Sequence, residues 1–441
     1  MIMKKFAKDF MLGAATAAHQ VEGNNIHSDY WVQEQVPHTM FVEPSLDAVD
    51  HYNRYEEDIR LLAEAGLNTY RFSIEWARIQ PEPDVWDEKE VQHYRDVLNC
   101  CKKYGIRPIV TMMHFSSPKW LITQGGWENP EVTEKFAAYC KRLAEELGEH
   151  LEYVCTINEA NMRLQLAALM KDMMKRMMSA PAEEKKDGEN PAKSAEGSVQ
   201  VGINIQSKEE MMMGMMETAQ AFGLQDPMGV HTFVSQCTPE GDKIVMKAHE
   251  AARAAMKAVC PHLKLGLTLS LHDLQPYPGG EKSAAAEWDE EFLHYLPCIE
   301  NDDFLGVQCY TRKRFDENGG AQPTEGRPRT QMGYEDYPMG IANVVRKVAE
   351  DFRGELIVTE NGIATEDDAR RCDFIKEAAE GLMKCIKDGI PLKGYMYWSL
   401  LDNFEWQKGF GMTFGLIAVD RKTQTRYTKE SLKVLGSLIE K

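Results

Sequence analysis

The sequence alternates short β-rich runs with longer segments of helical periodicity, and it does so eight times. The runs span residues 10–18, 68–74, 107–114, 153–159, 264–271, 304–310, 355–361 and 394–400. Between them, apolar residues recur at spacings of three and four, as from Val91 to Cys101, which builds one apolar helix face. Glycines that suit a left-handed helix end follow such segments at Gly66, Gly105, Gly148 and Gly389. Eight βα units with nearly continuous apolar strands predict an α/β protein folded as a closed parallel (β/α)8 TIM barrel.

The length of 441 residues would allow about three domains of roughly 150 residues, but a single barrel with long loops also reaches this size. An open doubly wound sheet would share the alternation, yet no G-x-G-x-x-G or P-loop motif follows any strand. We therefore predict one barrel domain over residues 1–441, with extended βα loops.

The largest surplus over a minimal barrel is an insertion at about 160–235. Its centre, residues 179–199, is rich in Lys, Glu, Ala, Gly and Pro and is expected to be a mobile loop. Met-dense stretches flank it at Met170–Met178 and Met211–Met216. Clustered methionines usually give adaptable core packing, and a pliable apolar binding surface is the alternative.

Charge and cysteine usage exclude several classes of partner. The net charge is -18, which repels nucleic-acid phosphates and anionic membrane surfaces, and no stretch approaches the roughly 18 apolar residues of a membrane span. The ten cysteines lack CxxC pairs and zinc spacing, which favours reduced thiols and a cytoplasmic protein. Residues 1–18 superficially resemble a secretory signal, but Asp9 interrupts their apolar stretch.

Polar side chains stand where several predicted strands end: His114, Asn158 and Glu159, Tyr310, and Glu360 and Asn361. Because parallel strands present their carboxyl ends to one mouth, these groups should converge. A single Glu there is more often a salt-bridge or cap partner. Two carboxylates facing one pocket, Glu159 and Glu360, are instead typical of an acid/base or nucleophile pair.

Three segments carry a specific resemblance: Thr-Ile-Asn-Glu at 156–159, Val-Thr-Glu-Asn-Gly at 358–362 and Tyr-Trp-Ser-Leu-Leu-Asp-Asn-Phe-Glu-Trp at 397–406. They resemble the signature segments of glycoside hydrolase family 1, the β-glucosidase family. FMLGAATAAHQVEG at 10–23, YRFSIEWARI at 70–79 and FGLIAVDR at 414–421 are similar to other family segments in the same order. The resemblance covers nearly the whole chain outside residues 160–235.

The resemblance implies a retaining β-glycosidase that needs no metal or organic cofactor and binds a small-molecule β-glycoside. Glu360 would be the nucleophile and Glu159 the acid/base. Retention requires their carboxyl groups to lie roughly 5 to 5.5 Å apart, so that the nucleophile attacks the anomeric carbon directly. An ionised Glu360 would also hold the proton on Glu159.

Further site residues follow from the motifs one by one. Gln20, His114, Asn158, Glu405 and Trp406 match glycone-binding groups, Trp398 matches the aromatic floor under the sugar, and Arg71 and Tyr310 match groups beside the nucleophile. Without the motifs, the histidine and the indoles would be read as core residues and the arginine as a structural ion pair.

The chain departs from the family pattern at three places: Ala160 stands for the usual Pro, His19 for the usual Tyr, and Gln308-Cys309 for Asn-Tyr. Gln308 keeps an amide near the nucleophile, so the departures concern aglycone specificity rather than the chemistry. The Glu405-Trp406 pair argues against a 6-phosphorylated sugar, because a carboxylate there would repel the phosphate.

Two other functions remain open on the sequence. A sugar-binding pseudoenzyme would keep the pocket without catalysis, although retention of both carboxylates speaks against it. A transglycosidase would pass the sugar to an alcohol instead of water. If the Met-rich flanks border the aglycone side, the substrate would carry a bulky apolar aglycone such as a phenolic or a sterol. The oligomeric state and the choice among gluco, galacto and fuco sugars stay open.

Overall fold

A closed barrel of eight parallel strands forms the centre of the molecule. The computed structural model describes residues 5–169, 200, 202–204, 206–235, 237–319 and 326–441. Around the barrel the strand order is β1-β10-β9-β7-β5-β4-β3-β2. The strands are β1 (Met11–Ala15), β2 (Thr69–Ser73), β3 (Arg107–Met113), β4 (Tyr153–Ile157), β5 (Lys264–Ser270), β7 (Phe304–Gln308), β9 (Glu355–Glu360) and β10 (Leu392–Trp398). Each overlaps one predicted run, so the (β/α)8 prediction is confirmed.

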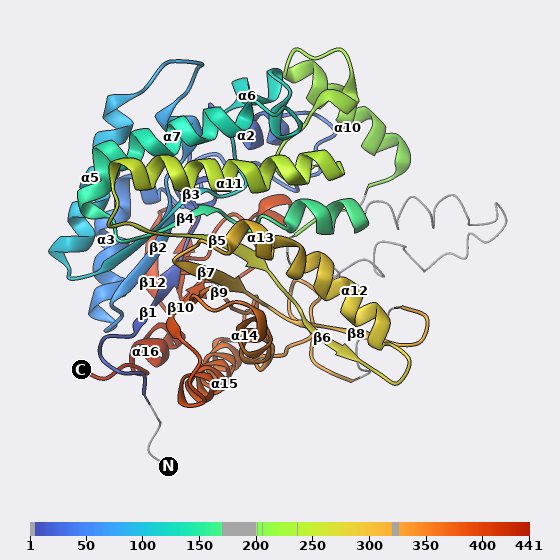
Figure 1. Cartoon of the computed structure of the whole chain (residues 1–441). Helices are drawn as coiled ribbons and strands as arrows, with labels where there is room; N and C mark the ends of the chain where they lie inside the picture. The colour runs from blue at the N-terminus through green and yellow to red at the C-terminus, as the bar shows by residue number, and fades with distance from the viewer. Residues whose placement is uncertain (1–4, 170–199, 201, 205, 236, 320–325) are drawn as a thin grey trace.

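Helices cover the outside of the barrel (Figure 1). They include α3 (His51–Glu64), α5 (Glu88–Lys103), α7 (Val132–Leu147), α11 (Pro239–Val259), α14 (Gly340–Asp351), α15 (Asp368–Lys387) and α16 (Glu430–Gly436). In α5, the Asp87 side chain accepts a hydrogen bond from the Lys89 amide and so caps the first turn. Its buried residues include Val91, Tyr94 and Val97, which lie on the apolar face expected from their spacing.

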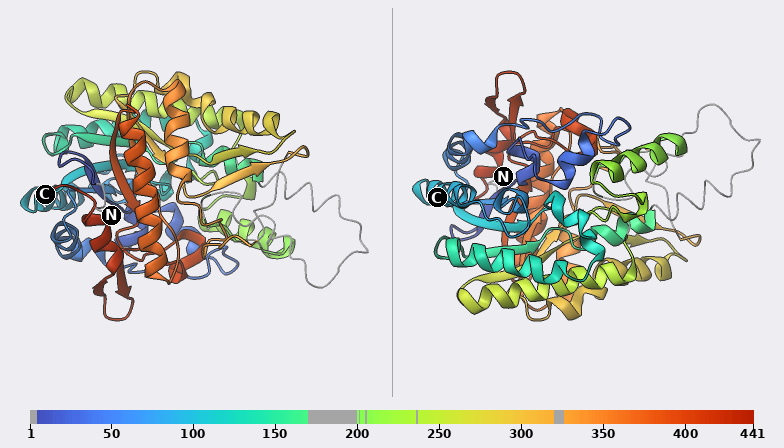
Figure 2. Two further views of the ribbon diagram at one scale, coloured as in Figure 1. Left: turned by 90° about the horizontal axis from the view of Figure 1, so that it is seen from below. Right: turned by 90° about the horizontal axis from the view of Figure 1, so that it is seen from above.

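Further helices and two strand pairs lie in the loops that connect these elements. They are α1 (Ala18–Val21), α2 (Asp29–Glu34), α4 (Trp76–Ile79), α6 (Lys119–Thr123), α10 (Lys208–Ala221), α12 (Glu281–Glu291), α13 (Leu296–Ile299), the parallel pair β6 (Asp273–Pro276) and β8 (Arg312–Phe315), and the antiparallel pair β11 (Ile417–Asp420) and β12 (Thr425–Thr428). Figures 1 and 2 show α10, β6 and β8 on the side of the molecule away from the two chain ends. The segments that follow β4, β5 and β7, which contain α10, β6 and β8, therefore lie at the same mouth of the barrel.

Two apolar clusters hold the barrel. One packs the helices against the outside of the sheet, and its members include Ile59 and Leu62 of α3. The other runs through the interior, with Met11, Ile109 and Met396 among its members. The interior is thus filled by side chains, as in other barrels of this size.

Three of the four expected glycine helix ends are confirmed. Gly66, Gly105 and Gly389 have φ values of 93°, 68° and 90°, the left-handed region that favours glycine. The prediction for Gly148 was wrong, because its φ is -57°. A Cβ atom there would lie 2.4 Å from Cys260 Sγ, so close packing against α11's end explains the glycine instead.

The prediction that the Met-rich flanks pack in the core is wrong for the flank that the structure describes. Met170–Met178 and the loop at 179–199 lie outside the described residues. Met211–Met216 form part of α10, where only Gly214 and Ala219 are buried, so these methionines do not pack in the core. Met212 and Met216 are 55% and 60% exposed.

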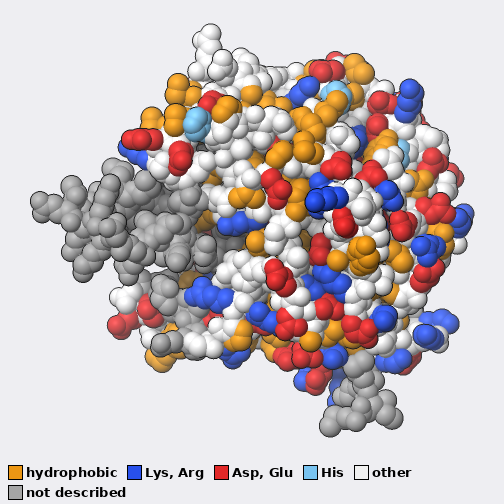
Figure 3. Space-filling model, turned by 180° about the vertical axis from the view of Figure 1, so that it is seen from behind, with side chains coloured by type: hydrophobic (Ala, Val, Ile, Leu, Met, Phe, Trp, Pro, Cys, Tyr) orange, Lys and Arg blue, Asp and Glu red, His pale blue; other side chains and the backbone are white. Residues whose placement is uncertain are grey.

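On the face shown in Figure 3, acidic and basic side chains are interspersed. Within the described part of the chain, no helix combines the length and the apolar character needed to cross a membrane.

Candidate active site

Polar and aromatic side chains from several strands line one cavity at the carboxyl end of the barrel. The lining residues are His114, Phe115, Asn158, Glu159, Gln200, Tyr310, Glu360, Trp398, Glu405, Trp406 and Phe414. Glu360 and Trp398 are the last residues of β9 and β10, while Glu159 follows β4. Of the residues named from the sequence, Gln20, Arg71 and Gln308 lie behind this cavity, hydrogen-bonded to residues that line it. The expectation that Asn361 joins them at the mouth was wrong, because its side chain bonds to Cys309 O and to the Tyr395 hydroxyl instead.

Both oxygens of the Glu360 carboxylate are held by donors. Arg71 Nη1 donates to Oε1 at 2.6 Å, and the Tyr310 hydroxyl donates to Oε2 at 2.6 Å. Burial raises the pKa of Glu360, and Arg71 and Tyr310 oppose that rise by stabilising the ionised form. The result is a carboxylate of fixed orientation at the bottom of the cavity.

Glu159 lies in a different environment. Its backbone is left-handed, with φ at 45°, and its amide donates to Thr268 Oγ1 at 2.8 Å. Burial raises the pKa of Glu159 well above its ordinary value, and the negative charge of Glu360 raises it further. Glu159 therefore keeps a proton under conditions in which Glu360 has lost its own.

Asn158 connects the two sides of the cavity. Its carbonyl oxygen accepts from Arg71 Nη2 at 2.6 Å and from Gln308 Nε2 at 2.8 Å. Its amide nitrogen is 3.1 Å from His114 Nε2, so that ring nitrogen accepts and the proton of the neutral ring lies on Nδ1. Burial and the nearby Arg71 hold the pKa of His114 well below its ordinary value. His114 Nδ1 is buried without a partner and can donate to a ligand.

Glu405 and Gln20 form a second polar pair. Gln20 Nε2 donates to Phe404 O at 2.8 Å and to Glu405 Oε2 at 3.4 Å, while its Oε1 is buried without a partner. Burial, followed by the charge of Glu360, raises the pKa of Glu405 to about 8. Free donors and acceptors of this kind suit a ligand rich in hydroxyl groups.

Two indoles flank His114. The ring centroids of Trp398 and Trp406 lie 5.7 and 6.1 Å from that of His114, each tilted by 21°. Aromatic faces of this kind can cover the C–H side of a sugar ring.

Two of the departures noted in the sequence lie beside this site. His19 Nε2 is 2.7 Å from Glu34 Oε1, and its ring stacks on Trp406 at 5.9 Å. Burial lowers the pKa of His19, but nearby carboxyl groups, chiefly Glu34, outweigh burial together and the net shift is upward. His19 thus supports Trp406 from behind, and Ala160 is buried next to Glu159.

Three cavity residues were not identified from the sequence. Phe115 directly follows His114, and Phe414 begins a quoted motif, so adjacency could have indicated both. Gln200 belongs to the insertion, where no motif marks it. Its Nε2 donates to Ser270 Oγ and to Leu271 O, both at 3.0 Å, and its Oε1 accepts from the Tyr310 amide.

The chain is similar to known proteins in sequence and in fold. The family model described as Glycosyl hydrolase family 1 matches residues 2–177 and 297–441. Beta-glucosidase A of Thermotoga maritima is 30% identical over 98% of this chain and 97% of its own length. The 6-phospho-beta-galactosidase of Leptotrichia buccalis is 28% identical, over 97% of each chain. The crystal structure of beta-glycosidase BGL167 superposes with a TM-score of 0.85 at 41% identity, covering 98% of this chain and 96% of that one.

Proposed function

The chain belongs to glycosyl hydrolase family 1, and we propose that this β-glycosidase cleaves an unphosphorylated β-D-glucoside, or a related β-glycoside, by double displacement with retention. The observation that carries the proposal is the unequal pair of carboxyl groups in one cavity. Arg71 and Tyr310 donate to the two oxygens of Glu360 and favour its ionised form, whereas burial and the charge of Glu360 raise the pKa of Glu159 well above its ordinary value. Such a pair supplies a nucleophile and an acid from the same residue type.

In the first displacement, a Glu360 oxygen attacks the anomeric carbon as the bond to the aglycone oxygen breaks. Glu159 donates its proton to that oxygen, so the aglycone leaves as a neutral alcohol. Arg71 and Tyr310 fix the direction of attack because each holds one oxygen of the nucleophile. A glycosyl ester on Glu360 results.

In the second displacement, water replaces the aglycone. Esterification removes the charge of Glu360, so the pKa of Glu159 falls and its carboxylate can accept a proton from the water. The hydroxide attacks the anomeric carbon, the ester bond to Glu360 breaks, and the β-configured sugar is released. The same two groups thus serve both steps.

Glu405, Gln20, Asn158 and His114 are proposed to bind the sugar hydroxyls, with Trp398 and Trp406 against its C–H face. The buried, unpartnered Gln20 Oε1 and His114 Nδ1 support this role. One relative of this chain, from Leptotrichia buccalis, is named a 6-phospho-beta-galactosidase, so the phosphorylated alternative has to be weighed. An unphosphorylated glycone is favoured here because the ionised form of Glu405 would repel a phosphate and its neutral form would supply no cation to bind one.

A bulky apolar aglycone would contact aromatic residues of the catalytic cavity rather than the methionines of α10. Among the described residues, no methionine of α10 lines the catalytic cavity, whereas Phe115 and Phe414 do.

Transglycosylation uses the same ester and differs only in the acceptor, so products formed with added alcohols distinguish it from hydrolysis.

The test is hydrolysis of aryl β-glycosides with gluco, galacto, fuco, glucurono and 6-phosphogluco groups. We expect release from an unphosphorylated sugar, and a loss of at least about 10⁴-fold in kcat for Glu360→Gln. Glu149→Gln, at a side chain that is 81% exposed, is the matched control and should keep wild-type rates. Unchanged turnover in Glu360→Gln would refute the assignment, and glucose binding without turnover by the wild type would favour the pseudoenzyme.

A further inference from the structure

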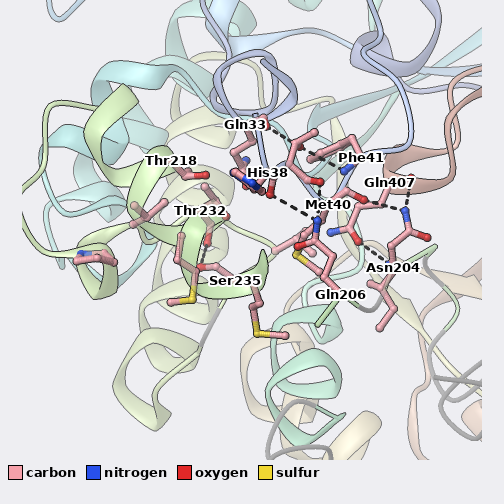
Figure 4. Close-up of a pocket in the computed structure, with 18 of the residues that line it drawn as sticks. Gln33, His38, Met40, Phe41, Asn204, Gln206, Thr218, Thr232, Ser235 and Gln407 are labelled. Carbon is pink, nitrogen blue, oxygen red and sulfur yellow. Dashed lines mark hydrogen bonds between the residues drawn. The ribbon is translucent and has the colours of Figure 1, made fainter. Parts of the chain in front are cut away.

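A second cavity lies beside the mouth of the barrel and is not explained by the proposed chemistry. Its volume is about 230 Å³. Three parts of the chain form most of its wall: the segment after α2, helix α10, and residues 227–235. Figure 4 shows Thr218, Thr232 and Ser235 on one side of it and Phe41, Asn204 and Gln407 on the other.

This cavity is separate from the catalytic one, since the two share no lining residue. Aromatic rings stand between them. Phe41 lines the second cavity and packs edge-on against Tyr30 at 5.8 Å, and Tyr30 in turn packs against Trp406 at 4.8 Å. Gln407, directly after Trp406, also lines the second cavity.

Specific hydrogen bonds hold its walls together. The His38 amide donates to Glu217 Oε2 at 2.8 Å, and the His38 ring is 2.7 Å from Glu217 Oε1, which ties α10 to the segment after α2. Asn204 Nδ2 donates to Met40 O at 2.8 Å and to Gln407 O at 2.6 Å. A Cβ atom on Gly214 would lie 2.3 Å from His38 O, so α10 approaches that segment closely. Hydrogen bonds and close packing therefore fix the walls of the cavity relative to one another.

The lining is mainly apolar. Met211, Met215 and Thr218 of α10 lie at helical spacing on the face toward the cavity, and Leu166 and Val234 also line it. An apolar cavity of about 150 Å³ is large enough to hold benzene, so this one can accommodate a substituted ring. Thioethers adapt to the outline of such a ligand.

Among the residues that the structure describes, two buried polar atoms of the cavity lining have no hydrogen-bond partner: Gln206 Oε1 and His231 Nδ1. Gln206 Nε2 donates to Thr39 O at 2.8 Å, which fixes the amide and leaves Oε1 as an acceptor. A buried acceptor without a donor is costly, and a ligand hydroxyl would satisfy it. An anion would be disfavoured by an acceptor and by the net charge of -18.

We propose that this cavity is a second ligand site, which takes a small uncharged apolar molecule with one hydroxyl group, such as a phenol or a terpene alcohol. The ring fills the methionine-lined space, and the hydroxyl donates to Gln206 Oε1. The site binds independently of catalysis, so it does not depend on the roles of Glu159 and Glu360.

The test is calorimetric titration of the full chain with 4-methylphenol, and with toluene as the partner that lacks the hydroxyl. Binding of 4-methylphenol should be about tenfold tighter than that of toluene, because one buried hydrogen bond is gained. Met215→Trp fills the cavity and should weaken 4-methylphenol binding at least about tenfold. Met216→Trp, on the exposed face of the same helix, is the matched control and should bind as the wild type does.

Gln206→Met keeps the length of the side chain but removes the acceptor, so the two ligands should then bind within about twofold of each other. This ratio does not depend on how well the variant folds. Glu360→Gln should bind 4-methylphenol as tightly as the wild type, which separates this site from the catalytic proposal. Wild-type affinity in Met215→Trp, or no binding of 4-methylphenol to the wild type, would overturn the proposal.

Discussion

At the scale of single residues, the catalytic cavity concentrates three buried carboxyl groups: Glu159, Glu360 and Glu405. Arg71 forms its ion pair with Glu360. Burial and the charge of Glu360 raise the pKa of both Glu159 and Glu405, so ionising either of them costs free energy. Burial in a site of low dielectric raises their pKa values and at the same time strengthens every hydrogen bond to a ligand. We infer that burial of these carboxyl groups lowers the stability of the fold and strengthens the hydrogen bonds that the cavity can make to a ligand.

Glu405→Gln should stabilise the free protein at high pH. The pKa of Glu405 is about 8 in the folded protein, against an ordinary value of 4.5, so the folded state resists its ionisation. Stability is intact below pH 4.5 and is lost as the pH rises towards 8, by up to about 5 kcal/mol. Gln removes this loss, so Tm should rise by about 5 °C at pH 8.5 and hardly change at pH 5.

At pH 8.5, where Glu405 is largely ionised, the same substitution should lower kcat/KM for a β-glucoside by about 10- to 100-fold, because charge-assisted hydrogen bonds to the sugar are lost; at pH 5 the loss should be smaller. Calorimetric scans and steady-state rates at the two pH values check both effects. A Tm change that is equal at pH 5 and pH 8.5 would contradict this account of Glu405.

At the scale of elements, local patterns predicted the strands well. β4 and β7 begin at the expected residues, and the ends differ by two residues, because the polar groups that close each run already lie in the loops. Sequence patterns gave wrong or missing predictions where a contact with a distant part of the chain determines the role of a residue. Gly148 serves packing against Cys260, α10 rests on a neighbouring loop instead of the core, and Gln200 reaches the site through partners far from it in sequence.

The motif residues were easier to place, since a parallel barrel brings every strand end to the same mouth. Glu159 and Glu360 lie in one cavity although 360 - 159 = 201 residues separate them. Their roles, unlike their positions, depend on the experiments above.

Arg426→Met should detach β12 from α3. Arg426 donates to Asp58 from Nε at 2.8 Å and from Nη2 at 2.9 Å, and both side chains are fully buried. Removing the cation leaves a buried carboxylate without its bidentate partner, so the free energy of unfolding at pH 7 should fall by about 3 to 5 kcal/mol. Lys433→Met, at an exposed ion pair with Glu430, should change it by less than about 0.5 kcal/mol.

The pH dependence of this loss identifies its cause. Burial raises the pKa of Asp58, but Arg426 and His51 outweigh it and hold the pKa below 3.8. The ion pair therefore contributes fully above pH 3.8 and is lost as the pH falls through the folded pKa. Urea titrations at pH 7 and pH 3 should show the difference between variant and wild type shrinking at the lower pH. A difference of equal size at both would mean that lost packing, not charge, is responsible.

At the scale of the whole molecule, closure of the barrel ties the two halves of the chain together. β1 pairs with β10 from Met11 opposite Gly394 to Ala15 opposite Trp398, and residues near both chain ends pair through Phe6 and Ile439. Since each strand is bonded to two others, opening one seam disrupts the mouth that positions the cavity residues. We therefore expect the core of the barrel to open as one unit.

The cysteines provide a direct measurement of that opening. All ten are free thiols, and all except Cys237 and Cys260 are buried. Burial raises the pKa of Cys237 to about 11 and also raises that of Cys260, so even the accessible thiols have little thiolate at neutral pH. With a disulfide reagent in excess, at most two thiols should react slowly in the native protein. The other eight should then appear together, at the rate of global unfolding measured by loss of near-ultraviolet circular dichroism. Early labelling of Cys385 in α15, ahead of Cys155 in β4, would show instead that the helical layer opens before the barrel does.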